Sequence, residues 1–218
     1  MERAKNKPLL KPGTNCALII LFHTVGLIGF LYPVWTPLFL KLVPFHLLLM
    51  MALLIAGQPD RRKAFWLFLT MAYLAGFFIE LLGISTGTIF GDYQYGNTLG
   101  LKLLDVPLMI GINWSMLLYS VAAFVVMLQI RNRVQRALLG AVLLVLLDIL
   151  IEPVAVKYNY WSWADMNIPF SNYVAWFLFS FVMLLFLFQF RFRRKNIAAA
   201  VLFIVQVLFF AALNIWAF

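Results

Sequence analysis

The sequence contains few charged residues and almost no cysteine. Charged residues make up 11% of the 218-residue chain and hydrophobic residues 65%, which is far from the composition of a soluble domain. Cys16 is the single cysteine, so an internal disulfide and a metal site built from several thiolates are both excluded. The two histidines, His23 and His46, fall on different apolar runs without the spacing of metal ligands. We therefore expect isolated, packed histidines and no bound metal.

Several catalytic motifs are also absent. The chain has no glycine-rich phosphate loop, no nucleophile elbow, no His-Glu-x-x-His zinc helix and no paired aspartate-rich motif for diphosphate and magnesium. The last apolar run, 197–217, contains no lysine for a Schiff base, which argues against a retinal protein. No segment is left to build a basic surface for nucleic acid. We attribute the net charge of +9 to short loops that meet anionic lipid headgroups, so the expected partners include membrane lipids and no nucleic acid.

Long apolar runs dominate the rest of the chain. A helix rises ~1.5 Å per residue and the hydrocarbon core is ~30 Å thick, so about 20 apolar residues can span a membrane. We predict an all-α membrane helix bundle of about seven transmembrane helices, forming a single domain over 1–218. The predicted spans lie near 15–32, 39–57, 64–84, 107–130, 135–152, 172–190 and 197–217. Pro33, Pro37 and Pro44 interrupt the approach to the second span.

The basic residues fall on one side of these spans. Of the 17 basic residues, 14 precede the first span or lie around the loops after spans two, four and six. The positive-inside rule therefore predicts a cytoplasmic N-terminus and an external C-terminus, in a bacterial or archaeal cytoplasmic membrane. The 14 residues are Arg3, Lys5, Lys7, Lys11, Arg61, Arg62, Lys63, Arg131, Arg133, Arg136, Arg191, Arg193, Arg194 and Lys195.

Most acidic residues gather toward the opposite side. Carboxyl groups are costly near lipid, so each one is a candidate functional residue. Asp148 and Glu152 are spaced i and i+4 and share one helix face just before Pro153. Glu80 lies about one turn from the outer end of the third span. The six acids on this side are Glu80, Asp92, Asp105, Asp148, Glu152 and Asp165.

Structural roles for the same acids stay open. Asp148 and Glu152 could hold helices together by hydrogen bonds, as polar residues do in membrane bundles. Glu80 could form an ion pair with Lys102 or Lys157. Either role would leave the carboxyl groups without a part in chemistry.

The loop acids and the tryptophans also have both structural and functional interpretations. Asp92 and Asp105 are loop residues that could serve in helix capping or turn formation. Asp105 stands just before the fourth span, in a natural position for a helix N-cap. For Trp161 and Trp163 we expect a structural role in an aromatic belt at the membrane interface. Trp114 and Trp176 lie inside predicted spans and are better candidates for the wall of a pocket.

A combination of motifs over roughly residues 75–180 resembles an integral-membrane carotenoid biosynthesis family. This family includes carotenoid 1,2-hydratases that act on γ-carotene or lycopene and bisanhydrobacterioruberin hydratase. No single motif would be sufficient, but their order along the chain is specific. The matching residues are Glu80, Thr86-Gly87, Phe90-Gly91, Tyr93, Tyr95, Leu99-Gly100, Val106-Pro107-Leu108, Trp114, Met116, Asp148, Glu152-Pro153, Trp161, Trp163, Pro169, Asn172 and Trp176.

The resemblance implies an enzyme that adds water to the terminal C1–C2 double bond of an acyclic carotenoid end-group, in lycopene, γ-carotene or a C50 carotenoid. Protonating such an alkene needs a strong acid, and a carboxyl group in an apolar pocket can serve as one. Aromatic faces would stabilise the tertiary carbocation, and no metal or other cofactor is needed. The candidate catalytic residues are Asp148, Glu152 and Glu80, and the candidate substrate-binding residues are Tyr93, Tyr95, Trp114, Asn172, Trp176 and Asp92.

Two other functions fit the same residues. One is a non-catalytic protein that binds or transports a carotenoid. The other is an isoprenoid end-group cyclase, because protonation of the same double bond begins that reaction too. The resemblance further implies a carotenoid as the substrate and other enzymes of the carotenoid pathway as partners.

Overall fold

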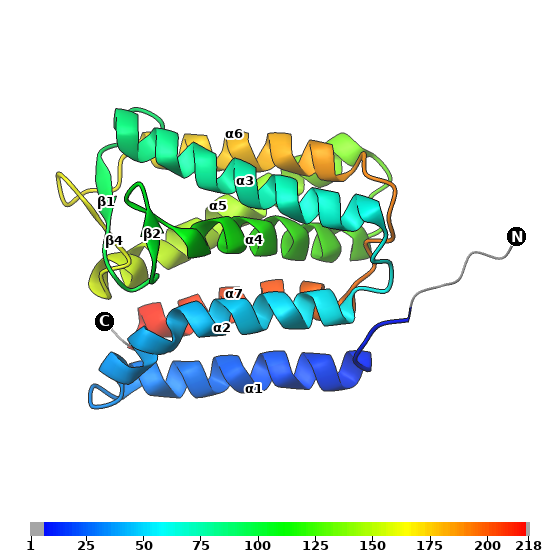
Figure 1. The fold of residues 1–218 in the computed structure, drawn as a ribbon, viewed down its shortest axis with the longest axis horizontal. Coiled ribbons are helices and arrows are strands. Elements are labelled where there is room, and N and C mark those ends of the chain that lie inside the picture. The colour runs from blue at the N-terminus through cyan, green and yellow to red at the C-terminus, as the bar shows by residue number, and fades with distance from the viewer. Residues whose placement is uncertain (1–6, 217–218) are drawn as a thin grey trace, which may run out of the picture.

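The computed structural model describes residues 7–216, which form seven long helices with short strands at one end (Figure 1). The helices are α1 (Pro12–Leu31), α2 (Thr36–Gly57), α3 (Lys63–Thr86), α4 (Leu108–Met127), α5 (Arg133–Lys157), α6 (Phe170–Leu187) and α7 (Ile197–Trp216). All seven are long and apolar enough to cross a membrane. The predicted all-α bundle of seven transmembrane helices is therefore confirmed, and only residue 217 of the last predicted span lies outside the described residues.

The helix ends agree with the predicted spans to within a few residues, except at the end of α5. The expected end was residue 152, but α5 continues through Pro153 to Lys157. Proline cannot donate a hydrogen bond to the carbonyl four residues earlier. Val154 and Ala155, which follow it, are each only 1% exposed, and their packing keeps the last turn helical.

The prolines near α2 are accommodated differently. Pro37 occupies the first turn of α2, where its missing N–H has no helical partner to lose. Pro44 lies in the interior of α2. The helix therefore begins before Pro37 and Pro44, whereas Pro33 lies in the turn between α1 and α2.

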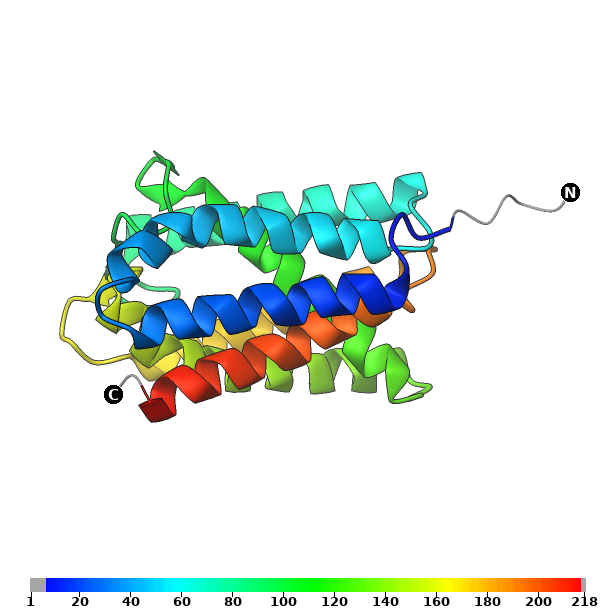
Figure 2. The same cartoon turned by 90° about the horizontal axis from the view of Figure 1, so that it is seen from below.

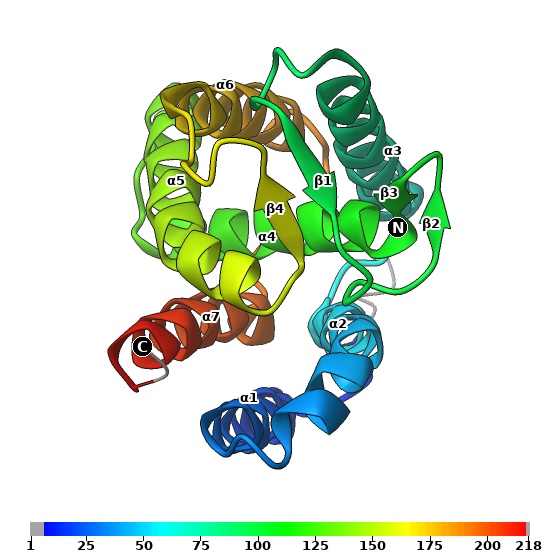
Figure 3. The same cartoon turned by 90° about the vertical axis from the view of Figure 1, so that its left-hand side faces the viewer.

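The bundle is organised around α4, the most buried of the helices. Figure 3 shows α3, α5 and α6 on one side of α4, and α1, α2 and α7 on the other. Figure 2 shows α1 running alongside α7, its main packing partner. Helices α3 and α4 approach closely because glycines face large rings. A Cβ atom on Gly76 would lie 2.5 Å from Trp114, and one on Gly111 would lie 2.7 Å from Tyr73.

The two long loops at one end of the bundle pair with each other. Strand β1 (Tyr93–Tyr95) runs antiparallel to β4 (Trp161–Trp163), with Tyr93 opposite Trp163 and Tyr95 opposite Trp161. Alternate side chains of a strand share one face. Tyr93, Tyr95, Trp161 and Trp163 are thereby presented together to the end of the helix bundle.

A second pair of strands decides between the two roles expected for Asp105, helix capping and turn formation. Strands β2 (Lys102–Leu103) and β3 (Val106–Pro107) form a hairpin, and its turn contains Leu104 and Asp105, both with positive φ. The N-cap position of α4 is occupied by Pro107, which makes no side-chain cap hydrogen bond. Asp105 is therefore a turn residue. Aspartate tolerates the left-handed conformation that such two-residue turns require.

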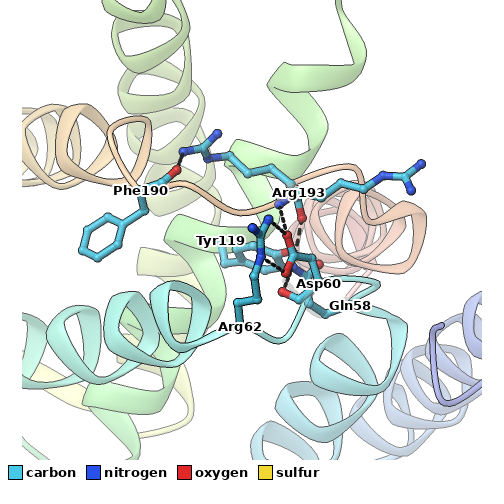
Figure 4. Close-up of polar contacts among 7 residues, drawn as sticks. Gln58, Asp60, Arg62, Tyr119, Phe190 and Arg193 are labelled. Atoms are coloured by element: carbon cyan, nitrogen blue, oxygen red, sulfur yellow. Dashed lines mark hydrogen bonds and ion pairs between the residues drawn. The ribbon is translucent and has the colours of Figure 1, made fainter. Parts of the chain in front are cut away.

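The opposite end, which we call the basic end, contains the loops between α2 and α3, α4 and α5, and α6 and α7. There the Asp60 carboxylate accepts hydrogen bonds from Arg62 Nε at 2.7 Å and from the Arg193 backbone N–H at 2.8 Å (Figure 4). Gln58 Nε2 donates to the Arg193 carbonyl at 2.9 Å, and Tyr119 donates to Gln58 Oε1 at 2.6 Å. These contacts tie two basic loops together.

The separation of charge agrees with the positive-inside argument, while the orientation across a membrane stays a prediction. Lys7 and Lys11 lie at the basic end of α1, next to the loop that contains Arg61, whose guanidinium donates to the Lys7 carbonyl. Arg3 and Lys5, which also entered the prediction, lie outside the described residues.

Candidate functional site

Three carboxyl groups from two helices come together at the acidic end of the bundle, which is the end opposite the basic loops. Glu80 comes from α3, while Asp148 and Glu152 come from adjacent turns of α5. Their residues are only 5%, 0% and 1% exposed. Glu80 and Glu152 line a cavity of about 40 Å³, which is large enough for one or two water molecules.

The carboxylate of Glu80 accepts hydrogen bonds at both oxygens. Tyr93 and Tyr95 donate their phenol O–H groups to Oε2 at 2.5 and 2.8 Å. The indole N–H of Trp114 donates to Oε1 at 2.9 Å. Hydrogen bonds to the charged form of a carboxyl favour that form. Glu80 is thus held as an acceptor by two loop residues and one residue of α4.

The two tyrosines are fixed as donors. Burial, followed by the negative charge of Glu80, raises the pKa of both Tyr93 and Tyr95 above the ordinary value for a phenol. A raised pKa keeps the phenol protonated, so both O–H groups stay available to Glu80 throughout the neutral and mildly alkaline range.

Glu152 and Asp148 form the second half of the cluster. Trp161 and Trp163 donate their indole N–H groups to Glu152 Oε2 at 3.1 and 2.9 Å. The side-chain amide of Asn172, from α6, donates to Asp148 Oδ2 at 2.8 Å and to Glu152 Oε1 at 3.4 Å. The other oxygen of Asp148, Oδ1, is buried without a hydrogen-bond partner among the described residues. Asp148 therefore lies behind Glu152 and is linked to it through Asn172.

Aromatic rings form much of the remaining cavity wall. The rings of Trp114 and Trp176 lie with their centroids 4.4 Å apart, and Tyr93 lies 5.2 Å from Trp163. All four residues line the cavity. Their π faces can stabilise a positive charge by roughly 0.5–2 kcal/mol each. The cavity therefore combines water-sized space, buried carboxyl groups and cation-stabilising walls.

A second, larger cavity adjoins the polar one. It has a volume of about 360 Å³ and is lined almost entirely by apolar side chains of α1, α2, α4, α5 and α7. Ile110, Asn113, Ile151 and Trp161 line both cavities. A long apolar ligand could thus lie in the large cavity and reach the carboxyl groups with one end.

Comparison with known proteins then identifies the family. Residues 38–218, well over half of the chain, match the profile of a family described as carotenoid biosynthesis protein. The chain belongs to this family. No solved structure matches it. Family membership and the seven membrane-spanning helices make it an integral membrane protein of carotenoid biosynthesis.

One relative in this family has an assigned activity. The chain is 32% identical over 127 residues to the bisanhydrobacterioruberin hydratase of Haloarcula japonica. The aligned region covers 55% of this chain and 42% of the relative, so it spans less than half of that protein's length.

The structure gathers nearly all of the candidate site residues. Of the nine predicted from the sequence, the structure joins eight by hydrogen bonds or in the wall of the polar cavity. Asp92 is the exception, because its residue is exposed and only its backbone carbonyl is engaged, by the Ala164 N–H at 3.0 Å. We therefore leave Asp92 out of the proposed site. Glu80 does not pair with Lys102, which donates instead to the Tyr95 carbonyl at 2.6 Å.

Three residues of the site were not predicted as such. Trp161 and Trp163 were expected to form an interfacial belt, but they donate to Glu152, and the signal was their i, i+2 spacing on a strand. Asn113 was overlooked, although it immediately precedes Trp114. Its side chain lines both cavities and makes no hydrogen bond to the residues described here.

The histidines also differ from expectation. His23 and His46 were expected to be isolated, yet their ring centroids lie 4.7 Å apart, because α1 and α2 are neighbours in the bundle. They line the large cavity and not the polar one. No group of three or more potential metal ligands occurs among residues 7–216.

Proposed function

We propose that this protein hydrates the terminal C1–C2 double bond of an acyclic carotenoid end-group and produces a tertiary alcohol. The observation that carries the proposal is the shared wall between the two cavities. A water-sized polar cavity with buried carboxyl groups adjoins an apolar cavity that suits an isoprenoid chain. Hydration of an unactivated alkene requires water, an acid and a greasy substrate to meet at one point, and this boundary supplies all three.

We assign Glu152 as the general acid. Its carboxyl group lines the polar cavity, whereas Asp148 does not. Glu152 Oε2 already accepts two indole hydrogen bonds, which leaves Oε1 as the oxygen that can carry the proton. Asp148 serves as the positioning partner, because the amide of Asn172 donates to both carboxyl groups and so fixes Glu152 relative to Asp148.

Proton transfer from Glu152 to C2 would leave a tertiary carbocation at C1. The faces of Trp114 and Trp176 lie beside the polar cavity and would stabilise that charge. A water molecule held by Asn113 and Glu80 would then attack C1 and form the C–O bond.

The remaining proton of the attacking water has an acceptor in Glu80. The carboxyl group of Glu80 lines the same cavity, and the hydrogen bonds from its three donors favour the charged form that a base requires. In the balanced reaction, the alkene gains one proton and one hydroxide, and one proton moves from Glu152 to Glu80. That proton returns to Glu152 through water in the cavity before the next turnover.

The proposal includes a membrane location. The carotenoid would lie within the bilayer of a bacterial or archaeal cytoplasmic membrane, with its reacting end toward the external face. This placement follows from the basic loops and from the position of the carboxyl cluster at the other end of the bundle.

The test is expression of the chain in a bacterium that accumulates lycopene or γ-carotene, followed by mass analysis of the pigments. A pigment heavier by one water is the expected result. A pigment of unchanged mass and altered spectrum would replace hydration with cyclisation. A purified protein that retains an unchanged carotenoid, without any new pigment, would replace catalysis with binding or transport.

A further inference from the structure

A second polar cluster lies inside the large apolar cavity, away from the carboxyl groups. It consists of His23 from the middle of α1, His46 from the middle of α2 and Gln206 from the middle of α7. His23 and Gln206 are each only 6% exposed. Most of the other residues that line this cavity are aliphatic or aromatic, so three polar side chains on three different helices are not accounted for by packing.

The hydrogen bonds of His23 define what this cluster offers. Its Nδ1 atom lies 2.9 Å from the carbonyl oxygen of Ile19. A carbonyl can only accept, so Nδ1 carries the proton, and in a neutral imidazole Nε2 is then an acceptor. No residue that the structure describes donates to Nε2 of His23.

Gln206 supplies the second unsatisfied group. Its Oε1 atom is buried and has no hydrogen-bond partner among residues 7–216. Buried polar groups in folded proteins nearly always have a partner, so an unpaired one needs an explanation. Rotation of the terminal amide can present either the oxygen or the N–H₂ group to the cavity.

We infer that His23, His46 and Gln206 bind a hydroxyl group carried by the apolar chain of the ligand. A hydroxyl can donate its proton to His23 Nε2 and accept a hydrogen bond from the N–H₂ group of Gln206, so the ligand would pair with one atom on each of two helices. His46, whose ring lies against that of His23, closes the third side. An unfunctionalised hydrocarbon would offer no hydrogen-bond partner to His23 Nε2 or to the Gln206 amide.

The position of the cluster indicates which class of substrate the protein binds. The same cavity continues to Asn113 and Trp161 at the edge of the carboxyl site. This inference rests on the proposed function in one respect: the chain whose double bond reaches Glu152 is the chain that carries the hydroxyl. The substrate class is then an isoprenoid that already contains an alcohol, so a reaction that introduces a hydroxyl group precedes this one.

The probe is geranylgeraniol, which has a dimethyl-substituted double bond at one end and a hydroxyl at the other. Purified full-length protein in detergent is offered an equimolar mixture of this alcohol and the hydrocarbon that lacks only the hydroxyl. Native mass spectrometry then gives the ratio of the two bound species. We expect the alcohol to be enriched about five- to tenfold, as one or two hydrogen bonds would give.

Variants distinguish binding of the alcohol at this site from its non-specific partitioning into detergent micelles. Gln206→Leu and His23→Phe should each bring the bound ratio close to that of the free mixture. Asn214→Leu changes a polar residue of α7 that lines neither cavity and should keep the wild-type ratio. Two variants on different helices are used so that poor folding of one does not remove the test.

Two results would overturn the inference. One is an equal ratio of alcohol and hydrocarbon in the wild-type protein. The other is a preference for the alcohol that survives both Gln206→Leu and His23→Phe. The same spectra show whether a bound species gains the mass of one water. A hydroxyl preference without that gain would reject hydration and retain the binding site, and the reverse pattern would retain hydration alone.

Discussion

Buried or half-buried carboxyl groups occur at both ends of this bundle, but their partners differ. At the basic end, Asp60 is paired with the Arg62 guanidinium and with a backbone N–H. At the acidic end, Glu80 and Glu152 accept their described hydrogen bonds from neutral phenol, indole and amide groups. A carboxylate matched by a cation is held in one state. One that is surrounded by neutral donors remains able to exchange a proton.

The carboxyl groups at the two ends therefore differ in role: Asp60 holds loops together, whereas those at the acidic end belong to the proposed site. The contacts of Asp60 join the α2–α3 loop to the α6–α7 loop, and Asp60 lines neither of the two cavities. Glu80 and Glu152 at the acidic end line a cavity and bring α3 and α5 together with the two long loops at that end. Substitutions at the acidic end should therefore reduce activity, whereas those at the basic end should reduce stability. The following experiments test that difference.

The largest effect is expected for Glu152→Gln. The amide keeps the shape of the side chain but cannot protonate an alkene, so hydration should fall by about 10²- to 10⁴-fold. The measurement is the hydrated pigment formed per amount of membrane protein in the carotenoid-producing strain. Asp60→Asn is the matched control and should retain hydration. If Asp148→Asn and Glu152→Gln each left hydration intact, the assignment of the acid would be wrong.

A smaller loss is expected for Tyr95→Phe. This change removes one donor from Glu80, and a hydrogen bond to a charged group is worth about 1.5–3 kcal/mol, so the rate should fall by roughly 10- to 100-fold. Because the pKa of Tyr95 is raised, the wild-type rate should show no decline from phenol ionisation up to the ordinary tyrosine pKa of ~10. A wild-type rate that falls along a phenol titration well below that pH would contradict the described hydrogen bonding.

Asn113→Leu should act on the water and not on the acid. Removing one neutral hydrogen-bond partner should reduce hydrated product about five- to tenfold. Because the carbocation still forms, side products of unchanged mass should increase in the same pigment extract. A fall in all products together would place Asn113 at the protonation step instead. Asn214→Leu is a useful comparison, because Asn214 bonds to the Leu150 carbonyl and lines neither cavity.

The smallest effect is expected for Asp60→Asn, and it is an effect on stability. The Arg62 side chain and the Arg193 N–H lower the pKa of Asp60 to about 2, compared with ~3.9 in an unfolded chain. The lowered pKa stabilises the fold above pH ~3.9, and this contribution is lost as the pH falls toward 2. At pH 7 the variant should unfold about 2–4 °C below wild type.

The test of this last prediction is the thermal midpoint of purified protein in detergent at a series of pH values. The difference between Asp60→Asn and wild type should narrow below pH 4 and close near pH 2. A constant difference across that range would show that the carboxylate charge contributes nothing. The Glu152→Gln variant should not reproduce this pattern.

Much of the fold could be predicted because membrane helices are encoded locally. Apolar run length placed all seven helices, and only the end of α5 was missed by more than a few residues, because Pro153 suggested a helix end while the packing of Val154 and Ala155 decided otherwise. Glu80, Asp148 and Glu152 were identifiable for a related reason, since buried carboxyl groups are conspicuous in an apolar sequence.

The missed features depend on contacts between distant segments. The pairing of β1 with β4 joins residues that are nearly 70 positions apart. No local sequence pattern therefore indicated that Trp161 and Trp163 donate to Glu152. The approach of His23 to His46 depends on how two helices pack. Asn113 gained significance only from the two cavities that it separates.

The origin of the site residues also has a consequence for biosynthesis. Glu80 comes from the third helix, but Asn172 and Trp176 come from the sixth, and the strand that faces Glu80 is paired with one made about 70 residues later. A nascent chain released into a membrane after five helices would hold Asp148 and Glu152 without the amide that bridges them. Asp148 and Glu152 therefore gain the hydrogen bonds from Asn172 only after the sixth helix has been translated. The proposed site is therefore incomplete until the sixth helix has been made.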